Sequence, residues 1–123
     1  MASKILIVED EEAIRGLLSE IFCVLEDCSI LFSRDGEEAL RTARVNSPDI
    51  VLLDVQIPKL NGYEVCRSTK SDGDLANAKI IMLSGMAQYS DRQQALEAGA
   101  DAFITKPFDI SALINKVKEC LKQ

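Results

Sequence analysis

Short apolar runs in this chain end on residues whose side chains could do chemistry. The acidic pair Glu9-Asp10 follows the first run, Asp54 the third and Ser84 the fourth, and Lys106 comes shortly after the fifth. Carboxylates held close together raise one another's pKa, and one lysine neutralises only one of them. A hard cation such as Mg²⁺ would remove the surplus charge and keep coordination positions for phosphoryl oxygens. These residue types therefore predict a Mg²⁺ site that handles a phosphoryl group.

The nucleophile of such a site is expected to be a carboxylate. Asp54 can form an aspartyl-phosphate, while the Ser84 hydroxyl and the Lys106 ammonium act on the phosphoryl oxygens. The chain has no histidine, which excludes a Ser-His-Asp triad, a His-ligated zinc and an imidazole base. Phosphoryl transfer depends more on positioning and charge neutralisation than on a proton-transfer base, so it is compatible with that absence.

The composition is that of one small globular domain. A chain of 123 residues suits a single hydrophobic core, and we expect residues 1–123 to form one domain. The 20 acidic residues outnumber the 14 basic ones, and the net charge of −6 argues against a nucleic-acid-binding surface over the whole domain. The N-terminus lacks the features of a signal peptide and no apolar run is long enough to span a bilayer, so we expect a cytoplasmic protein.

The four cysteines predict no disulfide framework. They form no CxxC pair, and a domain of this size builds its core without cross-links, so we expect reduced core residues. A reactive thiol or an occasional disulfide is the alternative. The residues are Cys23, Cys28, Cys66 and Cys120.

Five uninterrupted apolar runs predict the strands. Each is rich in Ile, Val, Leu or Phe, which is typical of strands buried on both faces of a parallel sheet and not of alternating edge strands. The predicted strands are Ile5–Val8, Ile30–Phe32, Ile50–Leu53, Ile80–Leu83 and Ala102–Ile104.

Segments with helical spacing separate these runs. Asp10 is predicted to cap the first helix, and Gly99 to take the C-terminal position of the fourth. The alternation of strand and helix predicts an α/β fold with a parallel sheet and helices on both faces. Ligands bind beyond the carboxyl ends of such strands, so the polar residues that end the runs are expected to converge. The predicted helices cover Glu11–Leu25, Glu37 to about Val45, Gly62 to about Lys70, about Ser90 to Ala98, and Asp109 to the end.

In order along the chain, these residues resemble the pattern of a known family. The resemblance is to the receiver domain of two-component response regulators, and it spans Lys4 to Leu121. It implies a flavodoxin-like, doubly wound (βα)5 fold, with a five-stranded parallel sheet in the order 2-1-3-4-5. The residues that carry it are Glu9-Asp10, Asp54, Pro58, Gly62, Ser84 and Lys106-Pro107.

The resemblance implies a role for each residue of the acidic cluster. Asp54 would be the phospho-accepting aspartate and would also line the metal site. Glu9 and Asp10 would hold Mg²⁺, Asp10 directly and Glu9 through water. The backbone carbonyl of Gln56 would be a further ligand.

The resemblance also implies a switch. The Ser84 hydroxyl would contact the phosphoryl group, Lys106 would pair with its oxygens, and Phe103 would rotate as Ser84 shifts. The face formed by the fourth helix, the fifth strand and the fifth helix would change as a result. A cis peptide bond would join Lys106 to Pro107. The positions expected to influence the lifetime of the phosphoryl group are Gln56 and Met86.

The function implied is that of a phosphorylation-dependent switch and not of a turnover enzyme. A histidine kinase or a histidine phosphotransfer protein would donate the phosphoryl group in a Mg²⁺-dependent reaction, and the domain would assist its own phosphorylation and dephosphorylation. The donor is expected to dock on the first helix and the loop after the fifth strand. The altered face would control an output protein or a fused effector domain, or form a homodimer. No direct contact with nucleic acid or membrane is expected.

Other interpretations need different residues at the same places. Taken singly, Asp10 could be only a helix cap, Lys106 a solvated lysine and Phe103 a core aromatic. A P-loop hydrolase would need a glycine-rich loop where the four acidic residues 9–12 stand, and a flavin- or dinucleotide-binding domain would want glycines there. A phosphatase resembling the haloacid dehalogenase family would need a second aspartate at position 56. A receiver-like interaction module that works without phosphorylation stays open, as does whether the domain stands alone or belongs to a longer chain.

Overall fold

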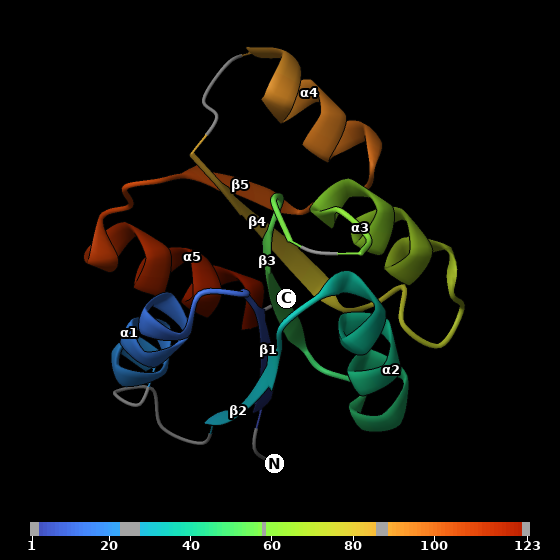
Figure 1. Cartoon of the computed structure of the whole chain (residues 1–123), viewed down its shortest axis with the longest axis horizontal. Helices are drawn as coiled ribbons and strands as arrows, with labels where there is room; N and C mark the ends of the chain where they lie inside the picture. The colour runs from blue at the N-terminus through green and yellow to red at the C-terminus, as the bar shows by residue number, and fades with distance from the viewer. Residues whose placement is uncertain (1–2, 23–27, 58, 86–88, 122–123) are drawn as a thin grey trace.

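In the computed structural model, five parallel strands form one sheet in the order β2-β1-β3-β4-β5 (Figure 1). The structure describes residues 3–22, 28–57, 59–85 and 89–121, so Cys23, Pro58, Met86 and the predicted end of the first helix lie outside the described residues. The predicted flavodoxin-like strand order is confirmed. The strands are β1 (Ser3–Val8), β2 (Cys28–Ser33), β3 (Ile50–Asp54), β4 (Lys79–Ser84) and β5 (Ala102–Thr105).

Each strand contains its predicted apolar run and extends beyond it by one or more residues. The backbone ladder continues into flanking polar residues because it needs only N–H and C=O groups, which hydropathy does not report. Helices alternate with the strands, and α1 and α5 cover one face of the sheet while α2, α3 and α4 cover the other (Figure 1). The helices are α1 (Glu12–Phe22), α2 (Gly36–Asn46), α3 (Gly62–Ser71), α4 (Tyr89–Glu97) and α5 (Ile110–Leu121).

Two hydrophobic cores explain why the strands are apolar throughout. Successive side chains of a strand point to opposite faces, so both sets of alternating residues must be buried when helices cover both faces. In β1, Ile5 and Ile7 pack with α1 and α5, whereas Leu6 and Val8 pack with the helices of the opposite face. All four side chains are buried.

The ends of two helices follow local sequence signals. The Asp35 carboxylate caps α2 by accepting a hydrogen bond from the Glu38 N–H at 2.9 Å. Gly99 ends α4 with a φ of 98°, as predicted. The N–H of Gly99 bonds the carbonyl of Leu96, and the N–H of Ala100 bonds that of Ala95. This pair of bonds satisfies the last carbonyls of the helix and requires the left-handed conformation that glycine adopts readily.

The prediction that Asp10 caps the first helix is wrong. α1 begins at Glu12, and the first helical bond runs from the N–H of Arg15 to the carbonyl of Glu11 at 3.0 Å. Glu11 therefore occupies the N-cap position, and Asp10 lies one residue before it. The Asp10 carboxylate lies instead with those of Glu9 and Asp54.

Two further features bear on the sequence-based expectations. In the described ranges, no helix has the combination of length and apolar character needed to cross a bilayer. Cys66 and Cys120 are buried thiols, as predicted for core residues. Burial raises the pKa of Cys66 to about 11, and its Sγ donates a hydrogen bond to the carbonyl of Ala98 at 3.3 Å.

Gly62, at the start of α3, packs against the end of β3. A Cβ atom at this position would lie 2.7 Å from the carbonyl oxygen of Asp54 and 2.7 Å from the Cα of Val55. Both neighbours are backbone atoms of a buried strand end, which cannot move aside cheaply. The N–H of Gly62 also bonds the carbonyl of Val55 at 2.9 Å. The lack of a side chain at Gly62 therefore sets how closely α3 approaches the residue that ends β3.

We predict that Gly62→Ala destabilises the domain by about 1–3 kcal/mol, because the added methyl group overpacks this contact. Gly16→Ala is the matched control, since Gly16 lies inside α1 and a methyl group added there would meet no atom within 4 Å. It should raise the free energy of unfolding by about 0.5–1 kcal/mol, because alanine favours the helix. Urea denaturation measures both. Equal stability of Gly62→Ala and the wild type would contradict this packing argument.

Candidate functional site

The site lies at the carboxyl edge of the sheet, where the direction of winding reverses between β1 and β3. Asp54 is the last residue of β3 and Ser84 the last of β4, while Glu9 directly follows β1 and Lys106 directly follows β5. Val8 pairs with Leu53, so the next residues along the two strands, Glu9 and Asp54, lie side by side. The predicted convergence is confirmed for Glu9, Asp10, Asp54 and Lys106.

Alternation along the strands explains which side chains meet. Every second residue of a strand points toward α1 and α5. In β1, β3 and β5, the next such position, at the carboxyl end of the strand, holds a charged residue. Glu9, Asp54 and Lys106 are those residues. The preceding members of the series, all packed with α1 and α5, are Ile5 and Ile7 in β1, Ile50 and Leu52 in β3, and Ala102 and Ile104 in β5.

Lys106 joins two carboxylates that come from distant parts of the sequence. Its Nζ lies 2.7 Å from Oδ2 of Asp54 and 3.1 Å from Oε2 of Glu9. Glu9 is 1% exposed and Asp54 is 7% exposed, so both acidic groups have lost most of their contact with water. A single ammonium ion therefore neutralises one of two buried negative charges and leaves a surplus.

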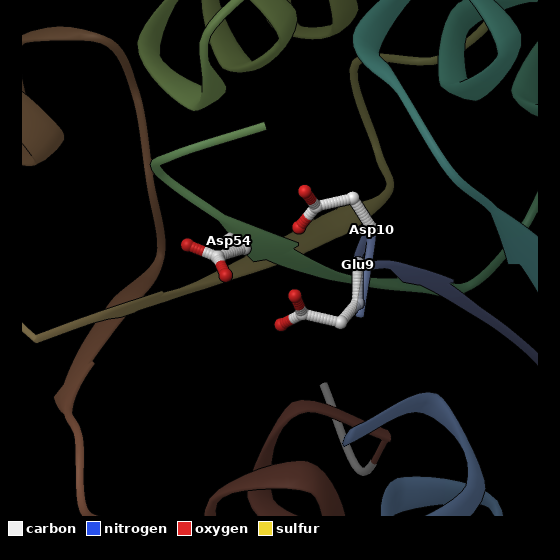
Figure 2. Close-up of side chains that lie close together, drawn as sticks. All are labelled: Glu9, Asp10 and Asp54. Carbon is white, nitrogen blue, oxygen red and sulfur yellow. The ribbon is translucent and has the colours of Figure 1, made fainter. Parts of the chain in front are cut away.

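Asp10 completes an acidic cluster. Each of Glu9, Asp10 and Asp54 offers a carboxylate oxygen, and these oxygens lie within 4.8 Å of one another. Figure 2 shows the three side chains extending into the same space beyond the ends of β1 and β3. Asp10 is exposed, which leaves the cluster open to solvent on that side.

The electrostatics of Glu9 reflect this crowding. Its pKa is raised to about 7, first because burial penalises the charged form and then because Asp54 lies beside it; Lys106 opposes the shift. Burial acts to lower the pKa of Lys106, but the hydrogen bond and charge of Asp54, together with the charge of Glu9, outweigh it and raise that pKa. Lys106 therefore stays protonated, and the unfavourable charge resides on the carboxylates.

Backbone groups hold the residues around the cluster. The Gln56 N–H donates to Oδ1 of Asp54 at 3.0 Å, so the peptide between Val55 and Gln56 lies beside the carboxylate, while the Gln56 side chain is exposed. The Lys106 N–H donates to the carbonyl of Ser84 at 2.7 Å, which ties the start of the loop after β5 to the end of β4. The peptide bond between Lys106 and Pro107 is cis, as the family resemblance implies.

Phe103 does not join the acidic cluster. It packs with the α2, α3 and α4 core on the opposite face of the sheet, and the same alternation sends Ser84 to that face after Ile80 and Met82. The guanidinium carbon of Arg92, from α4, lies 5.5 Å from the centre of the Phe103 ring. The two residues expected to form the switch thus lie on the face that α2, α3 and α4 cover, and Phe103 contacts α4.

Arg15 is a residue of the site that the sequence analysis missed. Its Nη1 donates to the carbonyl of Glu9 at 2.8 Å. The signal available in the sequence is a basic residue five positions after Asp10, in the first turn of the helix that follows, and many surface helices begin with such a residue. Its contact with the end of β1 appears only in the folded structure.

An apolar pocket adjoins Lys106. It lies between α1 and the loop that leads into α5, and its volume is about 300 Å³. Leu17 and Ile110, at 46% and 49% exposure, leave apolar surface open in the same pocket as Lys106. The pocket is lined by Ile14, Leu17, Lys106, Pro107, Phe108 and Ile110.

Comparison with known proteins agrees with this architecture. A probable transcriptional regulator, ycf27, of Guillardia theta is 38% identical over 98% of this chain and 46% of its own length, so the chain spans about half the length of that curated relative. The crystal structure of a putative response regulator from Chloroflexus aurantiacus superposes with a TM-score of 0.94 at 28% identity, over all of both chains.

A second similar structure was solved with a metal ion bound. It is the receiver domain of the sensor histidine kinase PA1611 from Pseudomonas aeruginosa, which has a magnesium ion coordinated in its active-site cleft. It superposes with a TM-score of 0.90 at 26% identity, over all of both chains. The pattern that defines the response regulator receiver domain matches residues 5–118. This chain belongs to the response regulator receiver domain family, whose members are signalling domains of two-component systems.

Proposed function

We propose that this domain accepts a phosphoryl group on Asp54, in a reaction that requires Mg²⁺, and that phosphorylation changes the surface formed by α4, β5 and α5. The observation that carries the proposal is the bridge from Lys106 to Asp54 and Glu9 inside an acidic cluster open to solvent at Asp10. Separate structural roles for these residues do not require them to meet at one edge of the sheet. A phosphoryl-transfer site does.

The residues of the cluster suit Mg²⁺. Their donors are carboxylate oxygens, the hard ligands that this ion prefers, and Asp10 keeps one side of the cluster in water, as the ion's retained waters require. Asp10, Glu9, Asp54 and the backbone carbonyl of Gln56 would hold it. When bound, Mg²⁺ would neutralise charge on the carboxylates and on the phosphoryl oxygens. The raised pKa of Glu9 points the same way: burial, and after it the neighbouring Asp54, disfavour the charged carboxylate, and a bound cation would favour it.

The proposed reaction is nucleophilic attack by the Asp54 carboxylate on phosphorus. A bond forms between a carboxylate oxygen of Asp54 and phosphorus while the bond from phosphorus to the donor's imidazole nitrogen breaks, and the imidazole keeps that electron pair and takes a proton from solvent. Lys106 remains charged beside Asp54 and neutralises part of the charge on the transferred group. The Ser84 hydroxyl would then contact a phosphoryl oxygen.

The donor that fits is a histidine outside this domain, because residues 1–123 contain none. We assign its docking to the exposed apolar surface of α1, the loop after β5 and the start of α5, which includes Leu17 and Ile110 and lies beside Lys106. A histidine kinase or a histidine phosphotransfer protein would present its phosphohistidine there.

The output would pass through the opposite face of the sheet. A shift of Ser84 toward the phosphoryl group would open space for Phe103, which lies under Arg92 of α4. Rotation of that ring would change how α4 packs on β5 and bias two states of the α4, β5 and α5 surface. An output protein, a fused effector domain or a second copy of the domain would recognise the changed surface.

We predict that incubation with acetyl phosphate and Mg²⁺ adds one phosphoryl group to the wild-type domain, as intact-mass spectrometry measures. Asp54→Asn should remove the adduct, because an amide is a poor nucleophile. Asp74→Asn, a substitution of an exposed loop aspartate, should keep it. A wild-type domain that gains no mass under these conditions would favour a receiver-like module that acts without phosphorylation.

Mg²⁺ should stabilise the domain, since a ligand that binds only the folded state adds about 1.4 kcal/mol at ten times its Kd. Thermal melting followed by circular dichroism, with and without Mg²⁺, measures the effect. Asp10→Asn should weaken or abolish it while changing the metal-free melting temperature little, because Asp10 is exposed. Glu12→Gln makes the same charge change at an exposed residue of α1 and should retain it. An Asp10→Asn domain stabilised as much as the wild type would contradict this metal site.

Lys106→Ala should leave some reactivity at Asp54 but uncouple it from the switch, because the ammonium that pairs with the phosphoryl oxygens is lost. Amide and Phe103 ring signals in NMR spectra, before and after acetyl phosphate, report the change of surface. Arg67→Ala, at an exposed position of α3 outside that surface, should switch as the wild type does. A full spectral change in phosphorylated Lys106→Ala would argue against the role of Lys106.

A further inference from the structure

We propose that Arg15 is a positioning residue for the metal site: it holds the peptide that joins Glu9 to Asp10, so that both carboxylates point into the cluster. The inference rests on the proposed Mg²⁺ site and adds a residue to it that the family resemblance does not assign. It concerns the affinity for the cation and not the phosphoryl-transfer step.

The contacts of Glu9 show how its backbone is fixed. Its N–H donates to the carbonyl of Ser33 in β2 at 3.0 Å, and its carbonyl accepts from Nη1 of Arg15 at 2.8 Å. Both hydrogen-bonding groups of this residue are therefore engaged just where the chain leaves β1. Glu9 is 1% exposed, so little water is available to its polar groups if the guanidinium is removed.

The side chain of Glu9 is held as well. Oε1 accepts from the Glu11 N–H at 3.3 Å, and Oε2 accepts from Lys106 at 3.1 Å. Asp10 lies between the two backbone groups that take part, the carbonyl of Glu9 and the N–H of Glu11. The direction of the Asp10 side chain is thus set by how the peptides on either side of it are anchored, and Arg15 anchors the first of them.

The position of Arg15 in α1 explains why it reaches this peptide. Its N–H makes the first helical bond, to Glu11, so Arg15 lies in the first turn. Side chains of a helix lean toward its N-terminus, and in α1 that direction leads back to the end of β1. An arginine keeps its charge at every working pH and offers several N–H donors in a fixed plane, which suits a lasting contact with a carbonyl.

Charge and positioning predict opposite results when Arg15 is replaced. A positive charge close to the acidic cluster repels a divalent cation, so removal of the charge alone would raise the affinity for Mg²⁺. Removal of a group that orients ligands lowers the affinity, as is usual for residues that hold metal ligands in place. The sign of the change therefore separates a positioning residue from a bystander.

The experiment compares three single variants with the wild type by calorimetric titration of the metal-free domain with Mg²⁺. Arg15→Met keeps the length of the aliphatic stem and removes the donors, and we expect it to weaken Mg²⁺ binding about tenfold. Arg15→Lys keeps a donor and the charge, and should recover part of the affinity. Arg67→Met, at an exposed arginine of α3, is the control for loss of one positive charge and should bind as the wild type does.

A second measurement separates positioning from general damage. At saturating Mg²⁺, the rate of labelling of Arg15→Met by acetyl phosphate should return to within about twofold of the wild type, because the bound cation then supplies the orientation that Arg15 provided. Unchanged or raised Mg²⁺ affinity in folded Arg15→Met would overturn the proposal. If that variant does not fold, Arg15→Gln takes its place, and an affinity equal to the wild type would overturn the proposal equally.

Failure of the proposed function has a different signature. A wild-type domain that does not bind Mg²⁺ would refute the metal site itself before any variant is made. A wild-type domain that binds Mg²⁺ but gains no phosphoryl group would refute the acceptor role of Asp54, and the effect of Arg15 on affinity would still be measurable.

Discussion

The structure of this domain depends on one unfavourable arrangement, which is the burial of two carboxylates beside each other with one ammonium ion between them. Lys106 reaches from the end of β5, past the end of β4, to Asp54 and Glu9, so one side chain links three strands of the sheet. The bridge leaves a surplus of negative charge in a poorly hydrated place, and the raised pKa of Glu9 reports its cost. Such a site is set up to gain free energy from a cation.

The packing around the cluster keeps this arrangement in place. Gly62 lets α3 approach the backbone of Asp54 and Val55 closely, and Arg15 holds the backbone of Glu9 from the other side of the sheet. The acidic site and the residues expected to form the switch lie on opposite faces of the sheet. Glu9, Asp54 and Lys106 continue the residues that face α1 and α5, whereas Ser84 and Phe103 lie on the face that α2, α3 and α4 cover. Chemistry on one face can therefore be reported on the other through β4 and β5.

Much of this was predictable because the physical causes are local. Apolar runs without alternation indicate strands covered on both faces, and Gly99 marks a helix end that needs a positive φ. The convergence of Glu9, Asp54 and Lys106 follows from the rule that parallel strands share a carboxyl edge. The cap assigned to Asp10 was wrong because an aspartate before a helix fits two roles, and only the neighbouring strand shows which applies.

The sequence by itself determined the order and type of the elements and the polar residues at their ends, because these depend on residue type and spacing alone. It also shows that residues 1–123 contain no histidine. Tertiary structure decided the burial, the contacts and the pKa values of those residues. Glu9 and Asp10 are adjacent acidic residues, yet one is buried against Lys106 and the other is exposed. Arg15 touches Glu9 because α1 folds back along β1. Burial, pKa and contact between distant segments arise only when the chain closes on itself, so no local pattern contains them.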